Sequence, residues 1–334
     1  MKKYKLLFTV TMILGTLITT SSYSWLGMWM GLEINLISII PLLSKNDVFS
    51  SESSIKYFIT QALASAIIML SVILFSLNQE ILTPFLSKTA ILMINSSLLT
   101  KMGAAPFHFW FPEVMEGLSW MNCFIMLTWQ KIAPMVMLMY NCSNTMFITM
   151  IIITSMLVSG IMGFNQVSMR KIMAYSSINH IGWMISALLY SQPIWMIYFV
   201  VYTIISVNIV VIFHLFNIFF MKQMILLQIS PITKLIFIMN FFSLGGLPPF
   251  LGFMPKWFTI QALIENNQLA LSFFMIMLTL LTLFFYMRIT FSTLVMSQNS
   301  IFASKTQFKN FWILTSNFVV LSSMIAFPLV FNLI

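Results

Sequence analysis

The chain has 334 residues, of which 60% are hydrophobic and only 7% are charged, with 16 basic and 7 acidic residues. An average soluble domain has about 25% charged residues, so this composition cannot form a water-soluble surface. It excludes a soluble enzyme, a nucleic-acid-binding protein and a disulfide-rich secreted domain. It predicts an all-α polytopic membrane protein, because the alternating apolar pattern of a β-barrel is absent.

About eleven segments have the roughly 20 apolar residues that a transmembrane helix needs. In chain order they are 5–24, 25–44, 55–77, 88–114, 119–140, 145–164, 173–190, 194–220, 232–264, 269–295 and 311–333. The connections are too short to hold a soluble domain, so we expect residues 1–334 to form a single transmembrane domain.

Two of these segments, 88–114 and 232–264, are interrupted by glycine and proline, which predicts two broken helices. They are the fourth and ninth spans, so they cross the membrane in opposite directions. Two interrupted helices in inverted positions indicate the inverted repeats of a transporter.

The basic residues in the loops and near the ends of the spans are distributed unequally between the two sides of the membrane. With the N-terminus inside, the outer side has only Lys88, and the inner side has Lys2, Lys3, Lys5, Lys45, Lys56, Arg170, Lys171, Lys222, Lys234, Lys305 and Lys309. An excess of basic residues in the inner loops is the usual orientation signal. We therefore expect the C-terminus outside, and the net charge of +9 implies no nucleic-acid partner.

The basic N-terminus followed by an apolar run also has the pattern of a signal peptide. No convincing small-residue cleavage site follows, and the charge distribution is consistent with a retained segment, so we favour a first membrane span.

Four charged residues are expected inside spans, namely Glu33, Lys101, Lys131 and Lys256. A charge at the centre of a membrane helix costs at least about 2.5–3.5 kcal/mol. Arg288 can instead extend its side chain to the inner surface. Buried ion pairs or tilted helices are one explanation for the four. A proton or ion path is the other, because an apolar site favours neutral lysine whereas a nearby carboxylate favours the charged form.

Each of the three lysines has a proline nearby, and proline cannot donate the helical hydrogen bond to the carbonyl four residues earlier. The carbonyls expected to be freed are those of Met102 (by Pro106), Gln130 (by Pro134), and Leu244 and Gly245 (by Pro248 and Pro249). Such carbonyls need water or protein partners at membrane depth. We expect a hydrated backbone defect beside each lysine, although each proline alone could be a simple kink.

His180, among serine and asparagine residues, and His108, just after the first break, are candidate proton-relay residues; a lone histidine is more often structural. No spacing of histidines or acids resembles a metal site. The two cysteines, Cys123 and Cys142, cannot hold an iron–sulfur cluster, which needs about four ligands. No dinucleotide or phosphate-binding loop is present, so we expect no cofactor in this chain.

Residues 101–112 (KMGAAPFHFWFP) resemble the broken-helix signature of the proton-translocating, antiporter-like membrane subunits of respiratory complex I. Supporting stretches are 25–35 (WLGMWMGLEIN), 129–134 (WQKIAP) and 243–253 (SLGGLPPFLGF). The resemblance covers essentially the whole chain, and it is greatest to the mitochondrial form of animals.

The resemblance implies a Glu and Lys pair, a central Lys and a terminal Lys along a water-filled axis at mid-membrane. These roles fall on Glu33 and Lys101, on Lys131, and on Lys256 respectively. It also implies that NADH, FMN, iron–sulfur clusters and ubiquinone are bound by other subunits, and that this chain contributes proton translocation.

Bacterial members of the family have fourteen helices, whereas this chain resembles the animal form that lacks the first three. We therefore expect other membrane-arm subunits of complex I, together with lipids, to cover the open flank. The resemblance implies the mitochondrial inner membrane, with the N-terminus on the matrix side and the C-terminus on the intermembrane-space side. The alternatives are a free-standing cation/proton antiporter and a purely structural membrane subunit.

Overall fold

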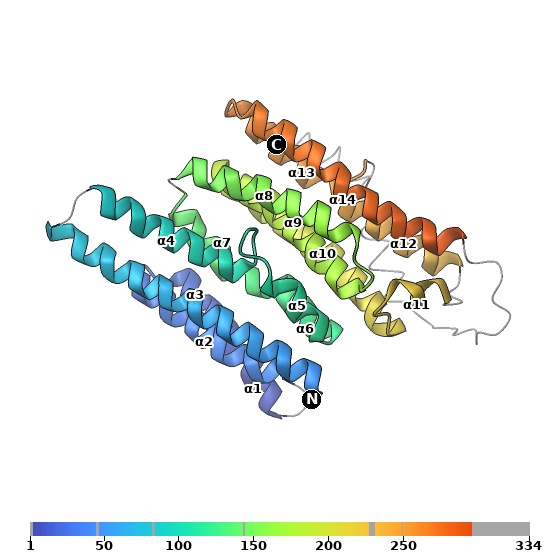
Figure 1. The fold of residues 1–334 in the computed structure, drawn as a ribbon, viewed down its shortest axis with the longest axis horizontal. Helices are drawn as coiled ribbons and strands as arrows, with labels where there is room; N and C mark the ends of the chain where they lie inside the picture. The colour runs from blue at the N-terminus through green and yellow to red at the C-terminus, as the bar shows by residue number, and fades with distance from the viewer. Residues whose placement is uncertain are drawn as a thin grey trace. The chain divides into compact units, whose positions relative to one another are not determined.

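The computed structural model describes residues 3–44, 47–81, 84–142, 144–226, 231–248 and 250–295. Within these ranges the chain is almost entirely helical (Figure 1), and its only β-pairing is an isolated bridge between Ser168 and Phe220. The predicted all-α fold is confirmed.

The helices are α1 (Lys3–Ser21), α2 (Trp25–Leu43), α3 (Val48–Ile81), α4 (Pro84–Met102), α5 (Trp110–Gly117), α6 (Trp120–Leu127), α7 (Trp129–Tyr140), α8 (Thr145–Phe164), α9 (Met169–Tyr190), α10 (Gln192–Phe216), α11 (Met221–Leu226), α12 (Pro231–Gly245), α13 (Phe253–Glu265) and α14 (Leu269–Val295).

Seven stretches of the described residues are long and apolar enough to cross a membrane. They lie in α1, α2, α3, α6 with α7, α8, α10 and α14. Among the halves of the broken helices, α5, α12 and α13 are too short to meet this criterion, whereas α4 is long enough but not apolar enough. The helix α9 carries a run of serine, asparagine and histidine. The expected span 311–333 lies outside the described residues, so the count of eleven stays a prediction.

The contacts between Cα atoms divide the chain into two units, Met1–Ile151 and Ile152–Ile334. In the first unit α1 packs along α2, α2 and α4 pack on α3, and α7 contacts α1 and α4 (Figure 1). In the second unit α9 packs on α10, and α13 contacts α9, α10 and α14. Each unit contains one of the two broken helices.

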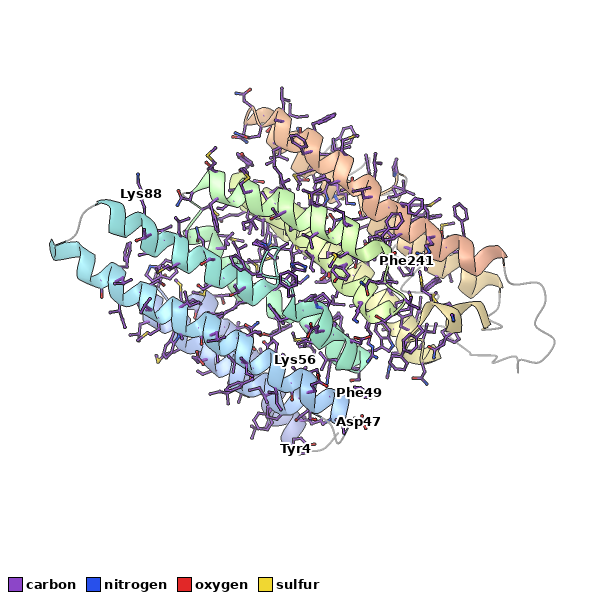
Figure 2. All side chains as sticks on the ribbon, viewed as in Figure 1. Tyr4, Asp47, Phe49, Lys56, Lys88 and Phe241 are labelled. Atoms are coloured by element: carbon purple, nitrogen blue, oxygen red, sulfur yellow. The ribbon has the colours of Figure 1, made fainter. Side chains whose placement is uncertain are left out.

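Figure 2 labels several residues along the helices of the first unit. Lys88 lies near one end of the unit, and Tyr4, Asp47 and Lys56 lie near the other. Lys56 is part of an exposed ion-pair cluster there, with its Nζ 3.0 Å from Glu52 and 2.9 Å from Glu113.

Both predicted breaks are present and have the same backbone turn. The first half-helix ends at a glycine in the left-handed region, Gly103 (φ 74°) after α4 and Gly246 (φ 73°) after α12. In each turn the glycine N–H donates to the carbonyl three residues earlier, and the next N–H donates to the carbonyl five residues before it. This is the Schellman motif, in which glycine is favoured because it has no Cβ.

The segments that follow, 103–109 and 246–252, are equal in length, although Pro249 lies outside the described residues. The two interruptions therefore share their turn type and their length, as expected for structural repeats.

Some boundaries differ from the sequence expectation. The span predicted at 119–140 is interrupted at Thr128, between α6 and α7, in the turn that precedes Pro134. The span predicted at 194–220 ends at Phe216, because Asn217 adopts the left-handed conformation (φ 50°) and terminates α10. The short helix α11 was not predicted.

The C-terminal end of α2 depends on a buried side chain from α6. Asn122 Nδ2 donates to the carbonyl oxygens of Leu42 (3.0 Å) and Leu43 (3.5 Å). The last carbonyls of a helix have no partner within the helix, so Asn122 supplies donors that would otherwise be missing inside the protein.

We expect Asn122→Leu to destabilise the protein by about 1–3 kcal/mol, because two buried carbonyls lose their donor. The measurement is the midpoint of thermal unfolding in mild detergent. The control is Met121→Leu, at a neighbouring residue that is 54% exposed. Equal midpoints for the two variants would show that the Asn122 bonds do not stabilise α2.

Candidate functional site

Lys101 lies in the last turn of α4, two residues before the break, and is 6% exposed. The half-buried Glu33 on α2 interacts electrostatically with its ammonium group. Among the described residues the two do not form a direct ion pair. The carboxylate therefore favours the charged lysine without a direct ion pair. Gln61 Nε2 on α3 donates to the backbone carbonyl of Lys101 (3.4 Å) and so ties α3 to the end of α4.

Lys131 lies in the first turn of α7 and is 1% exposed, which makes it one of the most buried large side chains described. Its Nζ lies 5.8 Å from the centroid of the Phe111 ring, a cation–π distance. Phe111 also packs against the first break, because a Cβ added to Gly103 would lie 3.1 Å from the Cβ of Phe111. One aromatic ring thus contacts both the break beside Lys101 and the central lysine.

Three neutral polar residues lie among these charged positions, and the sequence reasoning missed them. Asn35 and Gln130 form two reciprocal amide hydrogen bonds of 3.1 and 3.0 Å, and Tyr57 OH donates to Gln130 Oε1 (3.2 Å). The sequence contained a signal for two of the three, because each is close to a predicted site residue: Asn35 follows Glu33 by two residues, and Gln130 directly precedes Lys131.

In the second unit, Lys256 lies in the first turn of α13 and is 6% exposed. Its Nζ donates to the carbonyl oxygens of Gly245 (2.7 Å) and Leu244 (3.5 Å), at the end of α12. These are the carbonyls that the sequence predicted to lose their helical donors. Their partner within the protein is the ammonium group of Lys256 itself.

The end of α12 is also an electrostatic partner for Lys256. A helix C-terminus carries a partial negative charge that favours a nearby cation, and the ammonium lies 5.6 Å from the centroid of the Trp183 ring. The ammonium of Lys256 is therefore stabilised by backbone carbonyls and an aromatic face.

Both candidate histidines are buried. His180 Nδ1 lies 2.9 Å from Tyr198 OH, and the ring centroid lies 5.0 Å from that of Tyr202. His108 lies in the first break, with Nδ1 3.3 Å from the carbonyl oxygen of Pro106. The tyrosine partners of His180 come from α10, and nothing in the sequence near His180 indicated them.

Glu33, Lys101, Lys131 and His108 all lie in the first unit, and His180 and Lys256 lie on the packed helices α9 and α13 of the second. Within the residues that the structure describes, no three His, Cys, Asp or Glu side chains are grouped to hold a metal ion. Of the two cysteines, Cys123 is buried, with Sγ 3.6 Å from the carbonyl oxygen of Met115.

The sequence matches the family described as "NADH:quinone oxidoreductase/Mrp antiporter, TM" over residues 22–282. It is 48% identical to NADH-ubiquinone oxidoreductase chain 2 of Anopheles gambiae, over 98% of this chain and 94% of that protein. It is 45% identical to the protein of the same name from Locusta migratoria, over 88% of this chain and 86% of that protein.

Solved structures with the same fold include a chain of respiratory complex I from Thermus thermophilus with bound aureothin. Its TM-score is 0.85 at 21% identity, over 98% of this chain and 79% of that chain. A chain of the Mrp complex from Dietzia has a TM-score of 0.71 at 16% identity, over 84% of this chain and 59% of that chain.

The identity and coverage of the curated relatives are high enough to assign the family. This chain belongs to the NADH-ubiquinone oxidoreductase chain 2 family, within the NADH:quinone oxidoreductase/Mrp antiporter membrane proteins.

Proposed function

We propose that this chain is an antiporter-like subunit of the membrane arm of respiratory complex I in the mitochondrial inner membrane, and that it moves protons. In this proposal NADH, FMN, the iron–sulfur clusters and ubiquinone are bound by other subunits. Two cysteines are too few for a cluster with four cysteine ligands, so electron transfer is assigned to the partners of this chain.

The observation that carries the proposal is the group of buried charges in the first unit. Lys101 interacts with Glu33, and Lys131 is almost fully buried beside the same break. A charge buried at membrane depth is costly and marks ion and proton pathways. Two buried lysines and a half-buried carboxylate in one unit support proton transfer more than a purely structural role.

The coupling in this proposal begins with the electrostatic attraction between Glu33 and Lys101. Quinone chemistry in other subunits changes that attraction and shifts the first break. Phe111 contacts both the break and Lys131, so the change alters how tightly Lys131 holds its proton. Lys256 then exchanges a proton with the next segment or with the outer face.

The energies required are within reach of these interactions. Moving one charge against 100 mV costs about 2.3 kcal/mol. A hundredfold change in the proton affinity of one lysine is worth about 2.7 kcal/mol. A change of this size in the proton affinity of one buried lysine is therefore enough to move one proton against 100 mV.

The second unit supplies a protonation switch of a different kind. Charged Lys256 is stabilised by the carbonyl end of α12, and a neutral amine has a much weaker attraction to the same carbonyls. Loss of the proton therefore loosens the contact between α13 and α12. This links proton release at Lys256 to movement of the second broken helix.

The expected orientation is supported by the first unit. Lys88, the only lysine assigned to the outer side, lies near the end of the unit opposite Tyr4 and Lys56 (Figure 2). The exposed face of α1 carries apolar residues such as Leu6, Leu14 and Leu17, and such a surface is suited to contact with lipid or with neighbouring membrane-arm subunits.

The alternative of a free-standing cation/proton antiporter is favoured by one observation, the structural similarity to a chain of the Mrp complex. A native gel of inner membranes extracted in mild detergent and stained for NADH oxidation separates the two. Peptides of this chain in a very large NADH-active band would support the complex I proposal. Their presence only in a small, inactive species would favour the antiporter.

We expect Lys131→Met to leave assembly intact and to lower the number of protons moved per NADH oxidised. Coupled turnover should fall more than about tenfold, because positioned proton-transfer groups contribute about 10²–10⁴-fold. The measurement is proton uptake with NADH oxidation in sealed vesicles. Lys88→Met, at an exposed lysine, is the control and should behave like the unaltered protein. An unchanged proton stoichiometry in assembled Lys131→Met would refute the role of Lys131.

We expect Gly246→Ala to displace Lys256 from α12 and to lower coupled turnover. The added Cβ would lie 2.7 Å from Lys256 Cδ and 2.8 Å from its Nζ, and a left-handed alanine costs about 1–2 kcal/mol. Gly245→Ala is the matched control, because its Cβ would meet no atom closer than 3.7 Å. The same vesicle assay, corrected for the amount of assembled complex, should separate the two variants. Equal activity would show that the Lys256 contact is not used.

A further inference from the structure

A closed set of hydrogen bonds joins three helices of the first unit. Asn35 Nδ2 on α2 donates to Gln130 Oε1 on α7 (3.1 Å), and Gln130 Nε2 donates back to Asn35 Oδ1 (3.0 Å). Tyr57 OH on α3 donates to the same Gln130 oxygen (3.2 Å). Each amide thus donates one hydrogen bond to the other and accepts one from it, at distances typical of N–H···O bonds.

These side chains are buried, with exposures of 3% for Asn35, 3% for Tyr57 and 9% for Gln130. Buried amides are costly unless they are paired, and a paired set specifies one arrangement of the helices that carry it. Apolar residues at the same positions could pack these helices, but they would not fix a relative position to within a hydrogen-bond length.

The set lies next to the three charged residues of the candidate site in the first unit, Glu33, Lys101 and Lys131. Asn35 lies half a turn from Glu33 on α2, and Gln130 directly precedes Lys131 at the start of α7. One turn along α3 from Tyr57, Gln61 donates to the Lys101 carbonyl (3.4 Å).

Tyr57 also reaches the second half of the first broken helix. Its ring packs edge-on against Trp110 at 5.8 Å, and Trp110 Nε1 donates to the carbonyl of Thr100 (3.0 Å). The face of α3 that carries Tyr57 therefore contacts α4, α5 and α7.

We propose that Asn35, Gln130 and Tyr57 are positioning residues for proton transfer, which hold the Glu33 helix and the Lys131 helix in one relative position. An amide neither gains nor loses a proton near neutral pH, so the pair is not a relay. Its role is to let a change at Glu33 and Lys101 reach Lys131 through a rigid connection. The inference rests on the proposed function.

The test uses the assembled complex carrying Asn35→Leu, Gln130→Met or Tyr57→Phe, each close in shape to the original residue. We expect Tyr57→Phe to lower kcat of coupled NADH oxidation by about fivefold, the effect of losing one net hydrogen bond of about 1 kcal/mol. Asn35→Leu removes two of the bonds and Gln130→Met removes all three, so each should lower kcat by at least as much. KM for NADH and for ubiquinone should not change, because in the proposed function other subunits bind both substrates. The double variant Asn35→Gln with Gln130→Asn exchanges the two amides and should restore kcat.

Trp29→Phe is the matched control. Trp29 Nε1 donates to the Ser65 carbonyl (3.1 Å), so this variant removes another hydrogen bond between α2 and α3 without altering the amide pair. We expect its kcat to be unchanged. An equal loss in Trp29→Phe would show that helix packing in general is responsible, and would overturn the proposal.

Unchanged kcat in assembled Asn35→Leu and Gln130→Met would also overturn it. If these two do not assemble, Tyr57→Phe decides, because it removes only a hydroxyl group, and an unchanged kcat would again overturn the proposal. Lys131→Met separates this inference from the proposed function. A loss of pumping in Lys131→Met, with none in the amide variants, rejects the positioning role alone.

Discussion

The hydrocarbon core of a bilayer holds no water to hydrogen-bond an exposed backbone group, so every N–H and C=O needs a partner in the protein or in a water-filled cavity that the protein encloses. Both broken helices are organised by this requirement. Gly103 and Gly246 terminate the first half-helices in the same hydrogen-bonded turn. Carbonyls near the turns are paired with the Trp110 indole in the first unit and with the Lys256 ammonium in the second. A cation and a helix end that would each be unstable alone thus stabilise one another.

The three buried lysines are stabilised in three different ways. Lys101 interacts with a carboxylate, Lys131 lies near an aromatic ring, and Lys256 binds the carbonyl end of a helix. The strength of each depends on a different geometric variable: the position of Glu33, the orientation of Phe111 and the closure of the second break. In the proposed function, motion of any one element changes the proton affinity of its own lysine, which is the property that a stepwise proton path requires.

The charged part of the candidate site could be predicted from sequence, because a charge within a long apolar segment costs energy and stands out without knowledge of the fold. The freed carbonyls of Leu244 and Gly245 followed from the prolines after them. The neutral residues could not be predicted in this way. Asn35 and Gln130 are far apart in the chain, and Tyr198 is one of several tyrosines in apolar surroundings. Such residues occur often in membrane helices, and only their pairing distinguishes them.

By itself the sequence determined that the chain is a helical membrane protein, where the two broken helices are interrupted, and which charges are buried. These properties depend on local composition and on the chemistry of glycine and proline, which act within a few residues. Only the tertiary structure decided the partners: Lys256 on the carbonyls of α12, Phe111 between the first break and Lys131, and Asn35 paired with Gln130. Hydrogen bonds and ring contacts act over a few ångströms, so they depend on how distant segments pack, which no local pattern specifies.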